Sequence, residues 1–487
     1  MRSPVWTTNA MTGEDAPGER ARAPVPALAL AVLAALLPAC ATYAPAPIDP
    51  AESAHSFAAR RLDAPELRDE VARFLPTSSP WPPATWDRAQ LLAIALVQNP
   101  ELAVARAEVA ASVAHETGAG QLPNPTFGLQ SEYARREPQH WLYGVSIDVP
   151  LPVIGLRQLE VELARQESAA SRSRLMERTW SVRRALIGAL SDAESARRRL
   201  DVLTRLAAAQ ERLVDVQHQR VAAGEDTPSD LAVAQAAAID IEQQLAQARA
   251  DDATAHAAIA SALGLPPDAI DGIDIAWNDW GDPPADAKSS DAREQALLSR
   301  ADLATAIDEY AQNETKLKQA IARQYPQLEF KPGYYWDHGI AKWPLDVGVT
   351  LPLFNRNQGE IAEATAARDV AGRRLLATQA SIFGEIEAAE RSERIARDNV
   401  DVATRRVEVA RRQVEHADLA LRAGALDRME RSNAEIVALR ADLENVQAQA
   451  QLQSARNALE DALHAPLSGP ELALAASKPS AESGADR

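Results

Sequence analysis

Residues 157–223 read RQLEVELARQESAASRSRLMERTWSVRRALIGALSDAESARRRLDVLTRLAAAQERLVDVQHQRVAA, without a proline in a chain that has 31. Because proline costs about 3 kcal/mol inside a helix, this absence indicates helix. Apolar side chains recur in steps of four and three, as in the seam of a coiled coil: Val202, Leu206, Ala209, Leu213 and Val216. The stretch predicts one continuous helix on the order of 100 Å long at about 1.5 Å per residue, too long for a compact domain.

The helix is predicted to turn back on itself at Gly224. Glycine ends helices and proline is tolerated in the first turn of the next, so Gly224 followed by Thr227-Pro228 predicts a stop and a restart. Residues 231–248 repeat the apolar spacing of the first helix. Residues 353–465 contain a second proline-free stretch with Gly424 at its turn. Two helical hairpins are expected, over about 157–263 and about 357–464, with tips at Gly224 and Gly424.

The chain contains an internal repeat with an offset of about 200 residues. The matching landmarks keep their order: Asn99–Leu102 with Ser299–Leu303, Leu122-Pro123 with Tyr325-Pro326, Val145–Leu151 with Val347–Leu353, and Ala222–Gly224 with Arg422–Gly424. A duplication explains this order better than chance does. We therefore expect a first structural repeat over 85–285 and a second over 286–467.

Ahead of each long helix the sequence alternates apolar and polar residues. The four alternating segments lie within about 126–149 and about 328–351, and they contain many of the chain's few aromatic residues. Alternation with aromatics near the strand ends is typical of a membrane β-barrel wall, although soluble sheets also alternate. Four strands cannot close a barrel, and an open sheet edge is not tolerated in lipid. The chain is therefore expected to oligomerise: two copies would give eight strands and three would give twelve, and a wide tube favours three.

The N-terminus resembles a bacterial lipoprotein leader. Arg20 and Arg22 precede an apolar run over 27–37, which is too short to span a bilayer and ends just before Cys40. Residues 1–39 are expected to be a signal peptide, with Cys40, the only cysteine, as the lipidated (palmitate-bearing) first residue of the mature chain. A proline-rich tether is expected over 40–84 and a disordered tail over 468–487.

Charge and motifs exclude several classes of function. The formal net charge is −18, which disfavours nucleic acid as a partner. The sequence has no phosphate-binding loop, nucleophile motif or paired histidines, so we expect neither an enzyme nor a cofactor or metal site. A methionine ladder for soft metal ions is also absent.

The order of strand pair, long helix and returning helix, twice over, resembles the TolC-type outer-membrane efflux factors. Residues 99–102, Gly224 with Asp230, and the segment Pro352–Gly359 (PLFNRNQG) support the resemblance, and that segment is most similar to members that serve heavy-metal pumps. The implied fold is mainly α with a small membrane β part: hairpins form an α-barrel, and each chain gives four strands to a trimeric 12-stranded β-barrel. The implied protein is a lipid-anchored outer-membrane homotrimer that joins a periplasmic adaptor and an inner-membrane RND pump as a passive exit duct.

The resemblance also implies candidate functional residues at the hairpin tips. Asp230 and Glu430 would form carboxylate rings at the periplasmic mouth, while the alternative for Asp230 is a carboxylate at a helix N-terminus that stabilises the dipole of its own helix. Leu421 and Leu426 stand where other members have a locking tyrosine and arginine, so an apolar constriction is expected instead. The open alternatives are a drug or polypeptide cargo on the same fold, and a non-channel adaptor or coiled-coil lipoprotein.

Overall fold

The computed structural model describes residues 43–75, 80–151, 153–277, 294 and 300–472. The chain divides into two compact units, residues 1–56 and 57–487. In the first unit the described part holds the start of α2 (Pro50–Ala58), a helix with no buried residue. All other described elements belong to the second unit. Cys40 and the predicted signal peptide lie outside the described residues, as does most of the predicted C-terminal tail.

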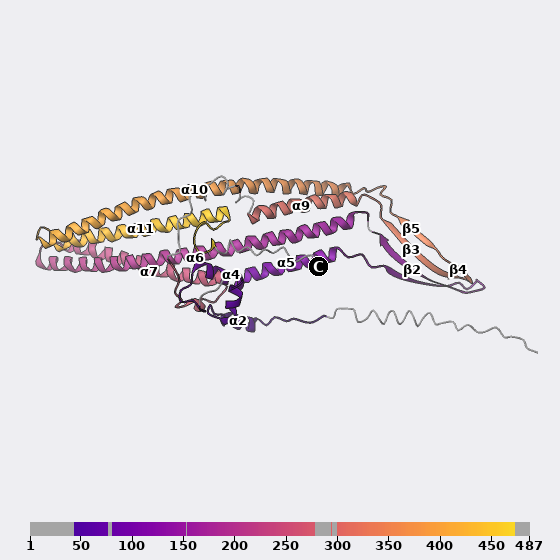
Figure 1. Ribbon diagram of the computed structural model, residues 1–487, viewed down its shortest axis with the longest axis horizontal. Coiled ribbons are helices and arrows are strands. Elements are labelled where there is room, and N and C mark those ends of the chain that lie inside the picture. Colours follow the sequence, from indigo (N-terminus) through magenta and orange to yellow (C-terminus); the bar gives the residue numbers. More distant parts are fainter. Residues whose placement is uncertain (1–42, 76–79, 152, 278–293, 295–299, 473–487) are drawn as a thin grey trace, which may run out of the picture. The chain divides into compact units, whose positions relative to one another are not determined.

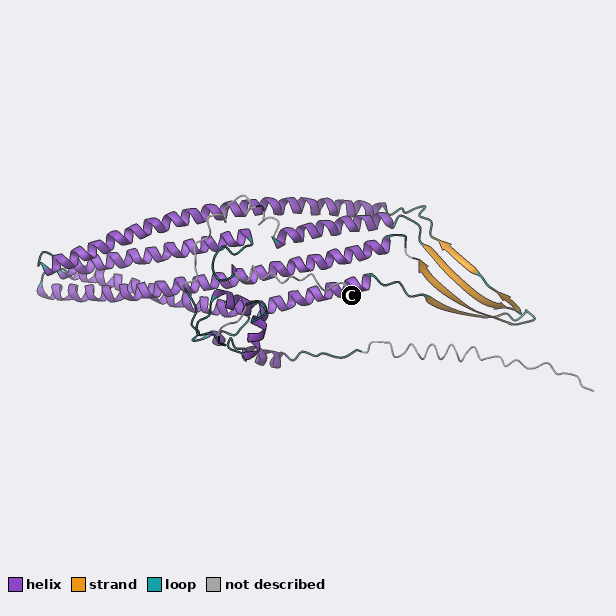
Figure 2. Cartoon of the chain, viewed as in Figure 1, coloured by secondary structure: helices purple, strands orange, loops and turns teal. Residues whose placement is uncertain are grey.

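Helices dominate the second unit, with strands at one end and hairpin tips at the other (Figures 1 and 2). No helix among the described residues is both long and apolar enough to cross a membrane. The elements in chain order are α3 (Pro65–Val71), α4 (Arg88–Gln98), α5 (Pro100–Ala119), β1 (Thr126–Tyr133), β2 (Trp141–Leu151), α6 (Leu156–Ala223), α7 (Pro228–Leu263), η2 (Pro267–Ile270), α9 (Ala301–Ala322), β3 (Leu328–Asp337), β4 (Ile340–Lys342), β5 (Leu345–Val349), α10 (Gln358–Arg422) and α11 (Arg428–Leu463).

The predicted mainly helical, duplicated fold is confirmed. The series α5, β1, β2, α6, α7 recurs as α9, β3, β4 with β5, α10, α11. Helix α6 has 68 residues and α10 has 65, and each ends at a tip where a glycine takes a left-handed conformation: φ is +74° at Gly224 and +71° at Gly424. Residues with a Cβ adopt this conformation at a cost, which is why glycine marks both turns.

The strands form one antiparallel sheet in the order β1-β2-β3-β4, with β5 also paired to β3. The alternating segments expected within about 328–351 form three strands and not two, because β4 lies between β3 and β5, which begins at Leu345. Pro344 separates the two, since proline has no N–H to give to the ladder. Its carbonyl still accepts a hydrogen bond from the Gly333 N–H at 2.9 Å, which keeps the segment against β3.

The main apolar core lies midway along the helices, not in the sheet. It joins α4, α6 and the end of α7 through fully buried side chains that include Leu91, Ile94, Leu186, Ile187 and Ile259. Each such side chain contributes about 1.5–3 kcal/mol relative to an exposed one. A smaller cluster in the second repeat joins the start of α9, α10 and the end of α11. Helix α6 also packs against α11 and α9, so it connects the two repeats.

Candidate functional site

The two acidic residues predicted for the mouth both lie in the first turn of a returning helix. The Asp230 carboxylate accepts hydrogen bonds from the Thr227 N–H at 3.1 Å and the Thr227 hydroxyl at 2.7 Å. Glu430 accepts from the Asp427 N–H at 3.1 Å, and its own N–H donates to the Asp427 carboxylate at 2.7 Å. Both pairs are capping boxes, which satisfy otherwise unpaired N–H groups at a helix start.

The capping role does not neutralise Asp230. The hydrogen bonds from the Thr227 hydroxyl and N–H lower the pKa of the Asp230 carboxyl below its usual value. Asp230 and Glu430 are both exposed. Both tips therefore present outward carboxylates, and their arrangement into rings stays a prediction. Leu421 and Leu426 are half-buried near the second tip, and their role as a constriction likewise stays a prediction.

Sequence reasoning missed an arginine that joins the two tips. Arg220, in the last turn of α6, donates to Asp226 at 2.7 Å and to Asp427 of the second hairpin at 3.1 Å. Glu225 lies 3.6 Å from the same guanidinium. The hydrogen bond to Asp226 raises the pKa of the Arg220 guanidinium. The sequence feature that could have predicted this contact is an arginine at the end of α6 close to hairpin loops that contain Glu225, Asp226 and Asp427.

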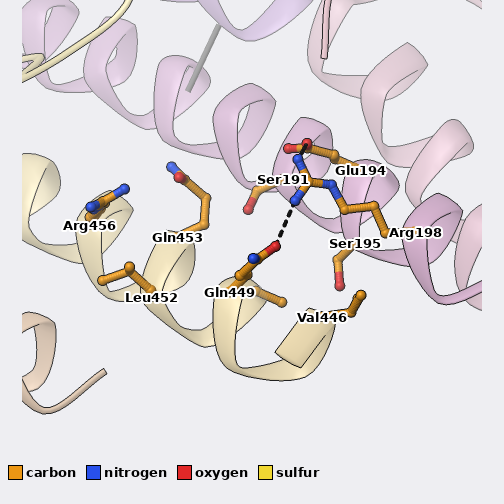
Figure 3. A pocket seen from close by; sticks show the side chains of 10 residues that line it. Ser191, Glu194, Ser195, Arg198, Val446, Gln449, Leu452, Gln453 and Arg456 are labelled. Atoms are coloured by element: carbon orange, nitrogen blue, oxygen red, sulfur yellow. Dashed lines mark hydrogen bonds and ion pairs between the residues drawn. The ribbon is translucent and has the colours of Figure 1, made fainter. Parts of the chain in front are cut away.

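Polar contacts also cross the seam between the repeats, where α6 faces α11. A cavity of about 230 Å³ opens there, lined by Ser191, Glu194 and Arg198 from α6 and by Gln449, Gln453 and Arg456 from α11 (Figure 3). Arg198 donates to Gln449 at 2.8 Å and pairs with Glu194 on its own helix. Burial raises the pKa of the Glu194 carboxyl. Charged side chains thus lie along the seam as well as at the tips.

Each repeat has a similar hydrogen bond between the end of its returning helix, α7 or α11, and the start of the helix that precedes its strands, α5 or α9. In the first repeat the Asn99 side chain donates to the Ala262 carbonyl at 2.9 Å. In the second the Arg300 guanidinium donates to the Ala462 carbonyl at 2.8 Å. Gly264 follows α7 with φ +73°, and His464 follows α11 with φ +47°. We call these contacts the first joint (Asn99, Ala262, Gly264) and the second joint (Arg300, Ala462, His464).

The second joint has the ionisable residues Arg300 and His464 where the first has Asn99 and Gly264. Arg300 also pairs with Asp302 at 2.7 Å and with Glu385 at 3.0 Å. A cavity of about 560 Å³ opens here, whose lining includes Glu177, Arg184 and Asp461. Burial raises the pKa of Glu177, and burial together with Arg300 lowers the pKa of His464 to about 4. His464 is therefore neutral at pH 7 and stacks on Trp180 with ring centroids 5.0 Å apart.

Among the described residues, no group of three or more His, Cys, Asp or Glu side chains is placed to hold a metal ion. What the described residues bring together is a pair of tips, a polar seam and two joints along a set of long helices, beside a small sheet.

The sequence profile of the outer membrane efflux protein family matches residues 91–265 and 292–464, one segment in each repeat. The chain belongs to this family. Its membership confirms the predicted resemblance to TolC-type efflux factors, while the closer likeness to the heavy-metal members stays a prediction. No curated protein matches this outer membrane efflux protein in sequence.

Solved structures share the fold of this outer membrane efflux protein. VceC of Vibrio cholerae is 19% identical, with a TM-score of 0.65 over 78% of this chain and 96% of VceC. The CmeC outer membrane channel of Campylobacter jejuni is 16% identical, with a TM-score of 0.65 over 77% of this chain and 85% of CmeC. The MtrE outer membrane channel of Neisseria gonorrhoeae is 17% identical, with a TM-score of 0.63 over 78% and 89%.

Proposed function

We propose that three copies of this chain form the outer-membrane exit duct of a tripartite efflux system. The observation that carries the proposal is the sheet: within the described residues β1 pairs only with β2, and β5 pairs only with β3. Each chain therefore leaves two strand edges open. Edges in lipid need partners, and the edges of neighbouring copies would supply them.

The strand faces support a membrane location for the sheet. Apolar side chains on alternate positions are exposed, among them Leu129 at 77% and Val347 at 60%. Soluble proteins seldom leave so continuous an apolar face to water. Lipid around a closed barrel would cover it, in line with membership of the outer membrane efflux protein family.

The helices would form the wall of a periplasmic tunnel that ends at the tips. A duct of this kind supplies a path and no driving force, so it needs an inner-membrane pump and a periplasmic adaptor that links the two. The tips, with Asp230 and Glu430 exposed, are the end that would meet these partners. We assign no cofactor and no catalytic role to any residue.

Heavy-metal cations are the proposed cargo, and the support for them is the predicted likeness of Pro352–Gly359 to members that serve heavy-metal pumps. The test is growth of a deletion strain on a panel of metal salts and drugs, with the intact gene restored as the control. Selective loss of metal tolerance is expected. Sensitivity to drugs alone, or loss of a secreted polypeptide, would instead assign one of the other cargoes.

Carboxylate rings at the mouth are tested by single-channel conductance in planar bilayers. Asp230→Asn combined with Glu430→Gln retains a side-chain oxygen for each helix cap and removes the charge. The cation-to-anion permeability ratio is expected to fall several-fold, because fixed carboxylates concentrate cations. A matched control is Glu408→Gln, on an exposed face of α10 away from the tips. An unchanged ratio in the double variant would assign both carboxylates to capping alone.

Lipidation of Cys40 is the last part of the proposal. Cys40→Ser should abolish incorporation of labelled palmitate. If the fatty chain is an additional anchor, the barrel should keep the variant in the outer-membrane fraction. Palmitate incorporation that persists without the thiol would contradict the assignment.

A further inference from the structure

Two apolar side chains project fully into solvent at the junctions between strand and long helix. Phe354 is 100% exposed and Ile154 is 95% exposed. They lie at corresponding junctions of the two repeats: Ile154 comes shortly before α6, which begins at Leu156, and Phe354 comes shortly before α10, which begins at Gln358. Phe354 belongs to the segment Pro352–Gly359, to which the proposed duct assigns no structural role.

Both side chains are presented by short, ordered turns. After β2 the Leu156 N–H donates to the Val153 carbonyl at 3.0 Å, and Gly155 takes φ +84° before α6 begins. After β5 the Leu353 N–H donates to the Leu351 carbonyl at 2.9 Å, and Asn357 takes φ +62° before α10 begins. Hydrogen bonding fixes these turns while Ile154 and Phe354 gain no burial within the chain.

The positions of β2 and β5 argue against burial of both Ile154 and Phe354 by a second copy of the chain. β5 is at the sheet edge, where a neighbouring copy would join, so Phe354 could lie at a seam between subunits. β2 is flanked on both sides by β1 and β3 of the same chain, so Ile154 lies away from that edge. Because both residues are nearly fully exposed, a medium that surrounds the sheet accounts for both.

Neighbouring residues indicate what that medium is. Leu353 and Leu351, beside Phe354, are also exposed, at 68% and 64%. Each junction then places an exposed arginine soon after the apolar side chain, Arg157 and Arg356. Apolar side chains followed by guanidinium groups suit the boundary of a bilayer, where acyl chains adjoin phosphate headgroups.

We propose that Ile154 and Phe354 are paired anchors that insert into the periplasm-facing leaflet of the membrane and set the depth of the sheet in it. The partner is a phospholipid surface, with acyl chains around the two side chains and headgroup phosphates beside Arg157 and Arg356. This proposal rests on the proposed function, since it needs the sheet to lie in a membrane.

The test measures the surroundings of each residue in the full chain, reconstituted in vesicles of phosphatidylethanolamine and phosphatidylglycerol. A nitroxide is attached at Ile154→Cys or Phe354→Cys, and its relaxation by oxygen, which enters lipid, is compared with that by a water-soluble nickel chelate. Reference labels are placed at Val347→Cys on β5 and Glu408→Cys on α10. The unsubstituted chain reports any labelling of Cys40.

Labels at 154 and 354 are expected to behave like the label at 347, with several-fold greater relaxation by oxygen than by nickel, and unlike the label at 408. Nickel-accessible labels at 154 and 354 beside a lipid-accessible label at 347 would overturn the anchor proposal and leave the duct intact. A label at 354 shielded from both reagents would overturn it in favour of a contact between subunits. A nickel-accessible label at 347 would overturn the membrane location of the sheet, and with it both proposals.

Discussion

His464 takes the same kind of left-handed backbone conformation as Gly264 at the equivalent place in the first repeat. For a residue with a Cβ this conformation costs roughly 1–2 kcal/mol, so other contacts must hold it. The side chain stacks on Trp180, is buried beside Arg300 and lies 4.0 Å from the Glu177 carboxylate. The second joint therefore combines backbone strain with a histidine that is kept neutral.

His464 should make stability depend on pH. Its folded pKa of about 4 lies below the ordinary value of 6.5, so the unfolded chain binds the proton more readily. Stability is thus lost as the pH falls from about 6.5 to about 4, and this contribution stays constant at lower pH. His464→Gly, which fits the left-handed conformation, should reduce the fall in thermal midpoint between pH 7 and pH 4.

The control for this measurement is His218→Gln, on an exposed part of α6, which should leave the pH dependence unchanged. Equal loss of midpoint on acidification in the intact chain and in His464→Gly would contradict the assignment of this titration to His464.

At the scale of elements, the chain segment after α11 closes a buried ion network. Arg183 of α6 donates to Glu460 at 2.5 Å and to Glu471 at 2.6 Å, and Arg88 of α4 lies 3.3 Å from Glu471. These four side chains are nearly fully buried. The network joins the start of the first repeat, its long helix and the end of the second repeat.

Removing one partner from a buried network leaves its counter-charges without compensation. Glu471→Ala should lower the free energy of unfolding by about 3–5 kcal/mol, measured by denaturant titration in detergent. Glu387→Ala, whose pairing with Arg391 is exposed and within one helix, should cost less than about 1 kcal/mol. Similar losses in both variants would show that the network is no stronger than a surface pair.

The contact between the hairpins gives a prediction for their tips. Arg220→Gln removes the charge that Asp226 and Asp427 share, so amide hydrogen exchange over 220–230 and 420–430 should rise several-fold without a change in the thermal midpoint. Arg205→Gln, which breaks a pair within α6 only, is the control. Faster exchange at the first tip alone would mean that Asp427 does not depend on Arg220.

The elements were predictable where one chemical signal dominated. Absence of proline and the three-four spacing predicted a helix over about 157–223, and α6 spans Leu156–Ala223. The joints, the Arg220 contact and the Arg183 network were not predictable, because each unites residues more than 150 positions apart and depends on which helices become neighbours. The place of Asp230 in the first turn of its helix was predictable, because the local sequence Thr227-Pro228 decides where α7 begins.

At the scale of the whole molecule, the open strand edges predict a closed set of chains, and the proposed function puts their number at three. Leu129→Cys on β1 combined with Val347→Cys on β5, treated with a short thiol crosslinker in membranes, should give a ladder of one, two and three chains. Leu129→Cys with Val145→Cys is the control, because these residues face each other within one sheet and should crosslink inside the chain. A ladder that ends at two, or continues past three, would contradict the proposed trimer.

The two joints also suggest how so much sequence can change while the architecture persists. In each, the side-chain donor bonds to a main-chain carbonyl, at Ala262 or at Ala462, and every amino acid provides that acceptor. Only the donor must be a particular kind of side chain, and both asparagine and arginine can donate this hydrogen bond. Mutations at the accepting position therefore leave the bond in place. Because only one of the two residues in each bond is restricted in type, the other can be substituted freely. This offers one physical reason why chains as little as 16–19% identical share this fold.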